Sequence, residues 1–159
     1  MHRILFVEES LEGLKNVIDT LGPQYLVTGV PSGEKALLSL DKEQFHLILL
    51  EVVLPDTDGF RLCATLQNKK ETQDIPVILL TTKGSLGDKI IGFSVGADDY
   101  IVKPFDPSEF KARVESRVTK FVSRNLRQNT ANSSEFVLPG IRFQPALQKV
   151  FVTDDGQEF

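Results

Sequence analysis

The stretch that most restricts the fold of this chain is His46–Phe60, which reads HLILLEVVLPDTDGF. Four apolar residues, Leu47–Leu50, end at the carboxylate of Glu51, and a turn rich in Pro, Asp and Gly follows. An apolar run bounded by turn residues is typical of a strand buried on both faces of a parallel sheet. Because open α/β sheets bind ligands at the carboxyl ends of their strands, Glu51 is the first candidate for a functional residue.

Apolar runs alternate with helical periodicities five times before residue 122. The runs predict strands at 4–7, 25–30, 46–52, 76–80 and 100–102. The periodicities predict helices at 11–21, 33–40, 59–68, 86–95 and 107–121. This alternation predicts a parallel sheet with right-handed crossovers and with helices on both faces. The pattern alone leaves the strand order open.

The sequence changes character after residue 122. Residues 123–135, SRNLRQNTANSSE, are polar without apolar periodicity, and we interpret them as a linker or a frayed helix end. Residues 136–159 contain short β-like runs separated by Pro-Gly and Asp-Gly turns, which predicts a short β-hairpin segment. So few strand residues cannot form a core of their own, so we expect them to pack on another structure.

Composition excludes several classes of protein. A net charge of -4 gives no bulk attraction to nucleic acid or to an anionic membrane surface. No apolar run approaches the ~18–20 residues that span a bilayer, so we expect a cytoplasmic protein without a membrane partner. The single cysteine, Cys63, cannot form an internal disulfide and lies on an apolar helical face. We expect Cys63, His2 and His46 to be structural.

Polar side chains gather where the predicted strands end. Glu8 and Glu9 follow the first strand, Glu51 the third, Thr81 the fourth and Lys103 the fifth. Carboxylates are suited to Mg²⁺, and a hydroxyl with an ammonium is suited to phosphoryl oxygens. The central carboxylate could itself accept a phosphoryl group.

Residues 3–122 resemble the receiver domains of bacterial response regulators, the signalling proteins of two-component systems. The segments LILLEVVLPDTDGF, PVILLTT and GADDYIVKPF carry the resemblance. It implies a flavodoxin-like (βα)5 fold with a doubly wound parallel sheet in the order 2-1-3-4-5. It also implies a signalling module rather than an enzyme, with a histidine kinase as a partner.

The resemblance also assigns roles to individual positions. It implies a phosphoacceptor-equivalent at Glu51, metal-binding acids at Glu8 and Glu9, switch residues at Thr81, Tyr100 and Lys103, and a cis peptide bond before Pro104. An X-Pro bond adopts the cis form at low cost.

The acidic positions depart from the pattern of that family, in which the acceptor is Asp and the acid pair usually contains Asp. Each Glu keeps the charge but moves the carboxylate by about 1.5 Å. Phosphoryl transfer depends on positioning, and an ångström-scale displacement can cost on the order of 10²-fold in rate. We therefore expect phosphorylation-independent behaviour, no required cofactor and at most weak Mg²⁺ binding.

Three interpretations of Glu51 stay open. Its longer side chain could reach Lys103 or Thr81 and act as a partial mimic of the phosphorylated state, with less charge than a phosphoryl group. Alternatively, the longer acids could compensate for one another in a working phosphoacceptor. The third interpretation is an inert receiver fold used for protein interaction or dimerisation.

The final segment, GIRFQPALQKVFVTDDGQEF, resembles the first strands of the winged-helix DNA-binding domain in OmpR/PhoB-type regulators. This resemblance implies a receiver domain at 1–122, a linker at 123–135 and the start of a winged-helix domain at 136–159. In that family a three-helix unit follows and its recognition helix reads DNA. We therefore expect DNA binding and transcriptional regulation only through C-terminal sequence that this chain lacks.

The same subfamily resemblance implies a homodimer through the helix at 86–95, the strand at 100–102 and the helix from 107. Two of its cross-subunit ion pairs correspond to Lys89 with Glu109 and to Asp99 with Arg113, whereas a third pair, at the positions of Ser94 and Glu115, is absent. A two-fold symmetric dimer is compatible with these opposite charges. Exposed pairs contribute only ~0–1 kcal/mol each, so they indicate geometry more than affinity.

Overall fold

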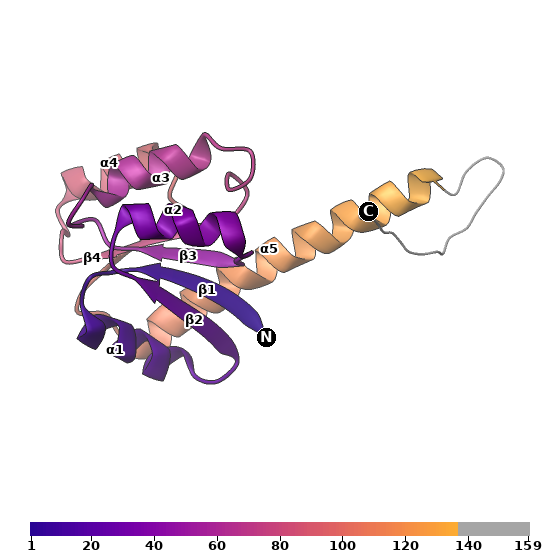
Figure 1. Cartoon of the computed structure of the whole chain (residues 1–159). Helices are drawn as coiled ribbons and strands as arrows, with labels where there is room; N and C mark the ends of the chain where they lie inside the picture. The colour runs from indigo at the N-terminus through magenta and orange to yellow at the C-terminus, as the bar shows by residue number, and fades with distance from the viewer. Residues whose placement is uncertain (137–159) are drawn as a thin grey trace. The chain divides into compact units, whose positions relative to one another are not determined.

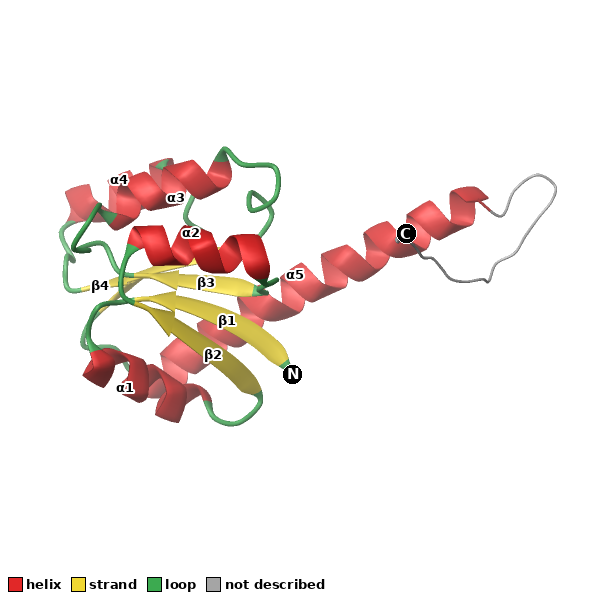
Figure 2. Cartoon of the chain, viewed as in Figure 1, coloured by secondary structure: helices red, strands yellow, loops and turns green. Residues whose placement is uncertain are grey.

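The computed structural model describes the backbone of residues 1–136 and the side chains of residues 1–129. Figure 2 shows strands and helices alternating along this part of the chain. The strands are β1 (His2–Val7), β2 (Tyr25–Val30), β3 (Leu47–Leu50), β4 (Val77–Thr81) and β5 (Asp99–Val102). The helices are α1 (Leu11–Leu21), α2 (Gly33–Lys42), α3 (Gly59–Gln67), α4 (Leu86–Ser94) and α5 (Pro107–Phe136).

The five strands form one parallel sheet in the order β2-β1-β3-β4-β5. The flavodoxin-like fold and the strand order implied by the family resemblance are therefore confirmed. All four residues of β3 and all five of β4 are fully buried, as the uninterrupted apolar runs predict. The sheet places the carboxyl ends of β1, β3, β4 and β5 along one edge.

Helices cover both faces of the sheet. Within residues 1–121, α2, α3 and α4 pack on one face and α1 and α5 on the other (Figure 1). The face of α5 toward the sheet consists of four buried apolar residues at helical spacing: Phe110, Val114, Val118 and Phe121. On the opposite face, Cys63 of α3 is fully buried, so its predicted place in the core is confirmed.

Strand β3 ends at Leu50, two residues before the predicted boundary at Val52. The N–H groups of Val52 and Val53 point to the side chain of Glu51 instead of a neighbouring strand. The carbonyl oxygen of Val52 accepts from the N–H of Gly59 at 2.7 Å. These bonds turn the chain out of the sheet directly after the acid, and the other strand boundaries differ from the predictions by two residues or fewer.

The segment 123–135 is helical, because α5 continues to Phe136. The backbone of this segment therefore agrees with the interpretation as the end of a helix, and its role as a linker stays a prediction. The structure divides into one unit at Met1–Phe121 and a second at Val122–Phe159. The hairpin segment predicted at 136–159 is wrong at its first residue, since Phe136 is the last residue of α5, and residues 137–159 lie outside the described residues. Among the described residues, none of the helices combines the length and the apolar composition that crossing a bilayer requires.

Candidate functional site

The candidate site lies at the carboxyl edge of the sheet, where four strand ends meet. Glu8 follows β1, Glu51 follows β3, Thr81 is the last residue of β4, and Lys103 follows β5. Since β1, β3, β4 and β5 are consecutive neighbours in the sheet, these side chains converge although they are far apart in sequence. We call Glu8, Glu51, Thr81 and Lys103 the acidic pocket.

The ammonium group of Lys103 bridges two carboxylates of the acidic pocket. Its Nζ atom lies 2.7 Å from Oε1 of Glu8 and 2.8 Å from Oε1 of Glu51. The exposed fraction of the side chain is 25% for Lys103, 9% for Glu8 and 8% for Glu51. Because water is largely excluded, these charges are screened less than those of surface ion pairs. Removing one charge would therefore leave its partner buried without compensation, at a high cost in free energy.

The second carboxylate oxygen of Glu51 is also engaged. Oε2 accepts hydrogen bonds from the backbone N–H groups of Val52 at 2.7 Å and Val53 at 3.2 Å. The hydroxyl of Thr81 also favours the charged form of Glu51 and lowers its pKa. Each oxygen of Glu51 therefore has a donor, and the extra methylene of Glu allows the side chain to fold back over its own strand end.

The protonation states follow from these contacts. Burial by itself would raise the pKa of Glu51, but hydrogen bonds from Lys103, Thr81 and the Val53 N–H outweigh it and lower the pKa below its usual range. Burial would likewise lower the pKa of Lys103, but its hydrogen bonds to Glu51 and Glu8 outweigh burial and raise the pKa. Glu51 and Lys103 are therefore both charged at neutral pH.

A chain of hydrogen bonds runs from the acidic pocket to β5. The hydroxyl of Thr81, which is fully buried, lowers the pKa of Glu51 and accepts from the N–H of Lys83 at 3.2 Å. The carbonyl oxygen of Lys83 accepts from the hydroxyl of Tyr100 at 2.5 Å. Tyr100 is buried, with only 5% of the residue exposed. The predicted switch residues Thr81, Tyr100 and Lys103 are thus connected through Glu51 and one backbone segment.

Glu9 is exposed and makes none of the ion pairs or hydrogen bonds found among the described residues. Within that part of the chain, no three Asp, Glu, His or Cys side chains are arranged to hold a metal ion. Glu8 and Glu51 instead share a resident cation, Lys103. The donor set as arranged therefore fits Mg²⁺ poorly, because a bound ion would have to displace the ammonium from both carboxylates.

Two contacts with the backbone, which the sequence does not predict, position the acidic pocket. A Cβ atom added to Gly59 would lie 2.5 Å from the carbonyl oxygen of Glu51, so only glycine lets α3 begin this close to the strand end. Asp56, in the turn after Glu51, accepts from the N–H groups of Gly33 at 2.9 Å and Glu34 at 2.9 Å. Asp56 thereby ties the turn to the N-terminus of α2, and these bonds lower its pKa.

The predicted dimer residues lie on α4, β5 and α5, and three of them contact one another within the chain. Arg113 binds Asp99 at 2.8 Å and Glu109 at 2.6 Å. Lys89 has no ion pair with a described residue.

The Lys103–Pro104 peptide bond is cis, as the resemblance implies.

Comparison with known proteins identifies the family. The family model described as "Response regulator receiver domain" matches residues 4–115, which include the whole sheet and the acidic pocket. This chain belongs to the response regulator receiver domain family. It is therefore a receiver domain of two-component signalling.

Individual relatives agree with this assignment. A "Probable transcriptional regulator ycf27" of Cyanophora paradoxa is 31% identical over 99% of this chain and 67% of its own length. A putative response regulator from Chloroflexus aurantiacus has a TM-score of 0.71 at 34% identity, covering 74% of this chain and 98% of that one. The receiver domain of a Pseudomonas aeruginosa sensor histidine kinase, solved with magnesium in its active-site cleft, has a TM-score of 0.68 at 26% identity, covering 74% and 98%.

The chain spans 67% of the length of the Cyanophora paradoxa relative and 42% of that of a ycf27 relative from Galdieria sulphuraria. Any activity that those longer proteins have as a whole can therefore only be proposed for this chain.

Proposed function

We propose that this chain is an atypical receiver whose signalling state is set by the Glu51–Lys103 ion pair and not by phosphoryl transfer. The observation that carries this proposal is that both carboxylate oxygens of Glu51 are engaged, Oε1 by Lys103 and Oε2 by two backbone N–H groups. An attacking carboxylate needs an oxygen free to approach phosphorus in line. Here such an attack would first require breaking a largely buried ion pair.

The same contacts support a partial mimic of the phosphorylated state. The charge of Glu51 reaches Lys103 and the hydroxyl of Thr81, two groups suited to phosphoryl oxygens. Through Lys83, that hydroxyl is connected to the buried ring of Tyr100. A carboxylate carries one negative charge, whereas a phosphoryl group adds about 1.5 to 2, so the mimicry is incomplete.

The test is incubation of the chain with acetyl phosphate and Mg²⁺, followed by intact-mass measurement. We expect no stoichiometric gain of a phosphoryl group. The matched control is Glu51→Gln, which lacks the nucleophile, so a gain that persists in the control lies at another residue. A stoichiometric gain in the native chain that the control lacks would overturn the proposal and favour a working phosphoacceptor.

A second measurement separates the mimic from an inert interaction module. The resonances of Tyr100 and of the Lys83 amide report the hydrogen-bond chain that begins at Glu51. Under our proposal, Glu51→Gln shifts both resonances because the charge that orders Thr81 is lost. Unchanged resonances would mean that the acidic pocket does not influence β5, as an inert module requires.

Magnesium binding is proposed to be weak and dispensable. A receiver that is 26% identical to this chain was solved with magnesium in its cleft. In this chain the ammonium of Lys103 holds Glu8 and Glu51. We therefore expect Mg²⁺ to bind more tightly to Lys103→Met than to the native chain, as measured by calorimetry.

The wider assignment is also a proposal. The ycf27 relatives are named as transcriptional regulators, which supports an OmpR/PhoB-type regulator with a receiver at 1–122, a connecting segment at 123–135 and a DNA-binding region beyond it. The receiver then acts by protein contact rather than as an enzyme, a histidine kinase is its upstream partner, and DNA is bound only through the C-terminal region.

A homodimer through α4, β5 and α5 has support from exposure. Leu86, Ile90 and Phe93 follow one face of α4 and are 74%, 59% and 51% exposed. Apolar residues gathered in this way mark interaction surfaces. Sedimentation of the native chain and of Ile90→Glu tests the proposal. We expect a dimer that the charge disrupts, and a native chain that is monomeric at high concentration would overturn it.

A further inference from the structure

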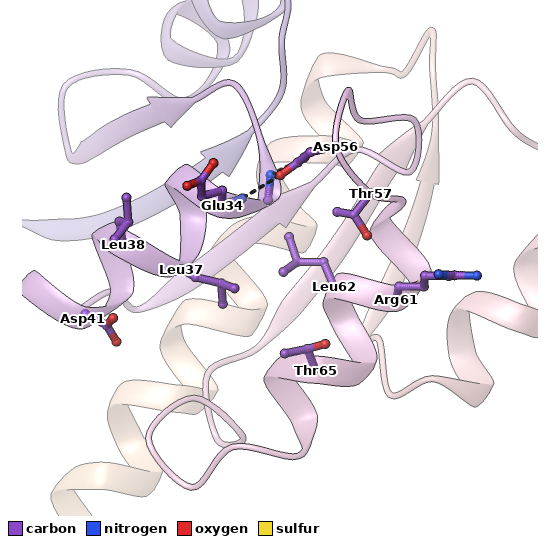
Figure 3. Close-up of a pocket in the computed structure, with 10 residues that line it drawn as sticks. Glu34, Leu37, Leu38, Asp41, Asp56, Thr57, Arg61, Leu62 and Thr65 are labelled. Atoms are coloured by element: carbon purple, nitrogen blue, oxygen red, sulfur yellow. Dashed lines mark hydrogen bonds between the residues drawn. The ribbon is translucent and has the colours of Figure 1, made fainter.

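A groove between α2 and α3 is used neither by the acidic pocket nor by the proposed dimer face. Its cavity volume is about 390 Å³, which is within the range of small-molecule sites. Figure 3 shows its walls, with α2 on one side and α3 and the turn after Glu51 on the other. It is lined by Gly33, Glu34, Leu37, Leu38, Asp41, Asp56, Thr57, Arg61, Leu62 and Thr65.

The middle of the groove is aliphatic. Leu37 of α2 and Leu62 of α3 point toward one another across it (Figure 3). Leu62 is buried, whereas Leu38, which also lines the groove from α2, is 47% exposed. Methylene groups placed in the groove would cover this apolar surface, which favours an aliphatic ligand.

Carboxylates lie toward the two ends of α2. Glu34 and Asp56 are near its N-terminal end, and Asp41 is near its C-terminal end. Glu34 and Asp41 are exposed and have no ion pair with any residue that the structure describes. Asp56 keeps its charge while binding two backbone N–H groups.

The single basic residue of the lining does not cancel these charges. Arg61 points away from α2 (Figure 3), and its Nε lies 3.4 Å from Oδ2 of Asp58. Its side chain is 83% exposed. The groove therefore presents two separated negative ends with an aliphatic surface between them.

The spacing of the carboxylates restricts the ligand. Glu34 and Asp41 are seven residues apart, which is about 10 Å along a helix axis at ~1.5 Å per residue. An extended aliphatic chain advances about 1.2 Å per bond, so the nine bonds between the terminal nitrogens of spermidine span about 11 Å, and the five of putrescine about 6 Å. A triamine can thus reach both ends, whereas a short diamine cannot.

We propose that the α2–α3 groove binds a linear aliphatic polyamine, with an ammonium group at each acidic end and methylene groups over Leu37, Leu38 and Leu62. This site is independent of the proposed role of Glu51. Since Asp56 and Thr57 belong to both the groove and the turn that follows Glu51, an occupant would also restrain that turn against α2.

The test is titration of the whole ¹⁵N- and ¹³C-methyl-labelled chain with spermidine at low salt. We expect saturable one-to-one binding, with shifts centred on the methyl groups of Leu37 and Leu62 and on the amide of Thr65. Putrescine should bind more weakly because it spans one end only. At ~1 M salt, where the Debye length is about 3 Å, the binding should be lost.

Matched variants separate a specific site from general attraction to an acidic protein. Glu34→Gln and Asp41→Asn should each weaken binding by up to about fivefold, the upper range for an exposed ion pair. Glu12→Gln, which removes the same charge from α1, should have no effect. Thr65→Lys places a tethered ammonium in the groove and should prevent binding.

Equal weakening by Glu12→Gln, or shifts that spread over the surface without saturation, would overturn the proposal. So would equal affinity for putrescine and spermidine. A Lys-rich peptide that saturates the groove when spermidine does not would assign the surface to a protein partner and reject the polyamine. Each variant changes an exposed side chain, and circular dichroism verifies its fold.

Discussion

The ion pair between Glu51 and Lys103 makes a measurable contribution to the stability of the fold. Glu51→Gln keeps the shape of the side chain and an oxygen that accepts from Val52 and Val53, but it removes the charge that faces Lys103. Removing one partner of a fully buried pair costs about 3–5 kcal/mol, because it leaves an uncompensated charge. In this pocket Glu8 still pairs with Lys103, which is 25% exposed, so we reduce the expected loss.

We expect Glu51→Gln to lower the free energy of unfolding by about 1–3 kcal/mol at pH 7, which for a domain of this size corresponds to roughly 5–10 °C in Tm. Urea denaturation followed by circular dichroism measures the difference. Glu9→Gln is the matched control, since Glu9 carries the same charge at the same edge but is exposed and outside the ion pair. It should leave stability unchanged.

The pH dependence identifies the cause of the loss. The pKa of Glu51 is lowered in the folded state, so its contribution is complete above its ordinary value of 4.5 and is lost as pH falls through the folded pKa. The pKa of Lys103 is raised, so its contribution is complete below 10.5 and is lost only above that value. The difference between native chain and variant should therefore be constant from about pH 5 to 10 and shrink in acid. A variant as stable as the native chain at pH 7, or a difference unchanged in acid, refutes this reasoning.

Three other substitutions test separate contacts. Gly59→Ala should lower stability by about 1–3 kcal/mol, measured by thermal melting, since its Cβ would lie 2.5 Å from a backbone oxygen of Glu51. The pKa of His46 is lowered by burial and by the nearby charge of His2, and its Nδ1 accepts from the Arg3 N–H at 2.9 Å. The native chain should therefore lose stability as pH falls below 6.5, and His46→Gln should remove this part of the dependence in urea titrations at pH 5 and 8. Tyr100→Phe removes one buried hydrogen bond and should cost about 1 kcal/mol in urea denaturation; no change would mean that water replaces the hydroxyl.

The sheet and the acidic pocket could be predicted because strand ends are encoded locally. The apolar runs of β3 and β4 marked two strands, and parallel geometry brought Glu51 and Lys103 to one edge. The expectation that Glu51 would reach Lys103 agrees with a separation of 2.8 Å. That Glu8 binds the same ammonium group follows only from the side-chain positions.

Contacts that use the backbone could not be predicted. The carbonyl of Lys83, which binds Tyr100, has no signature in the sequence, because every residue carries the same carbonyl group. The partners of Asp56 are more than twenty residues away on α2. The segment 123–135 was left open between a linker and a frayed helix end for another reason. Extending a helix adds one hydrogen bond for each residue fixed, and this extension requires no apolar face.

The position of Lys103 determines what the reverse substitution, Glu51→Asp, can restore. Shortening the side chain by about 1.5 Å forces the carboxylate to give up either Lys103 or the N–H groups of the strand end. Lys103 would still be held by Glu8, and Glu9 would still be exposed, so the acids would not form a metal-binding group. We therefore expect no stoichiometric phosphorylation of Glu51→Asp by acetyl phosphate and Mg²⁺ in an intact-mass assay. The comparison is the triple variant Glu8→Asp, Glu9→Asp and Glu51→Asp, in which all three acids shorten together and phosphorylation should exceed that of the single variant. Full phosphorylation of the single variant would show that one methylene blocks the reaction, and that the contact between Glu8 and Lys103 does not.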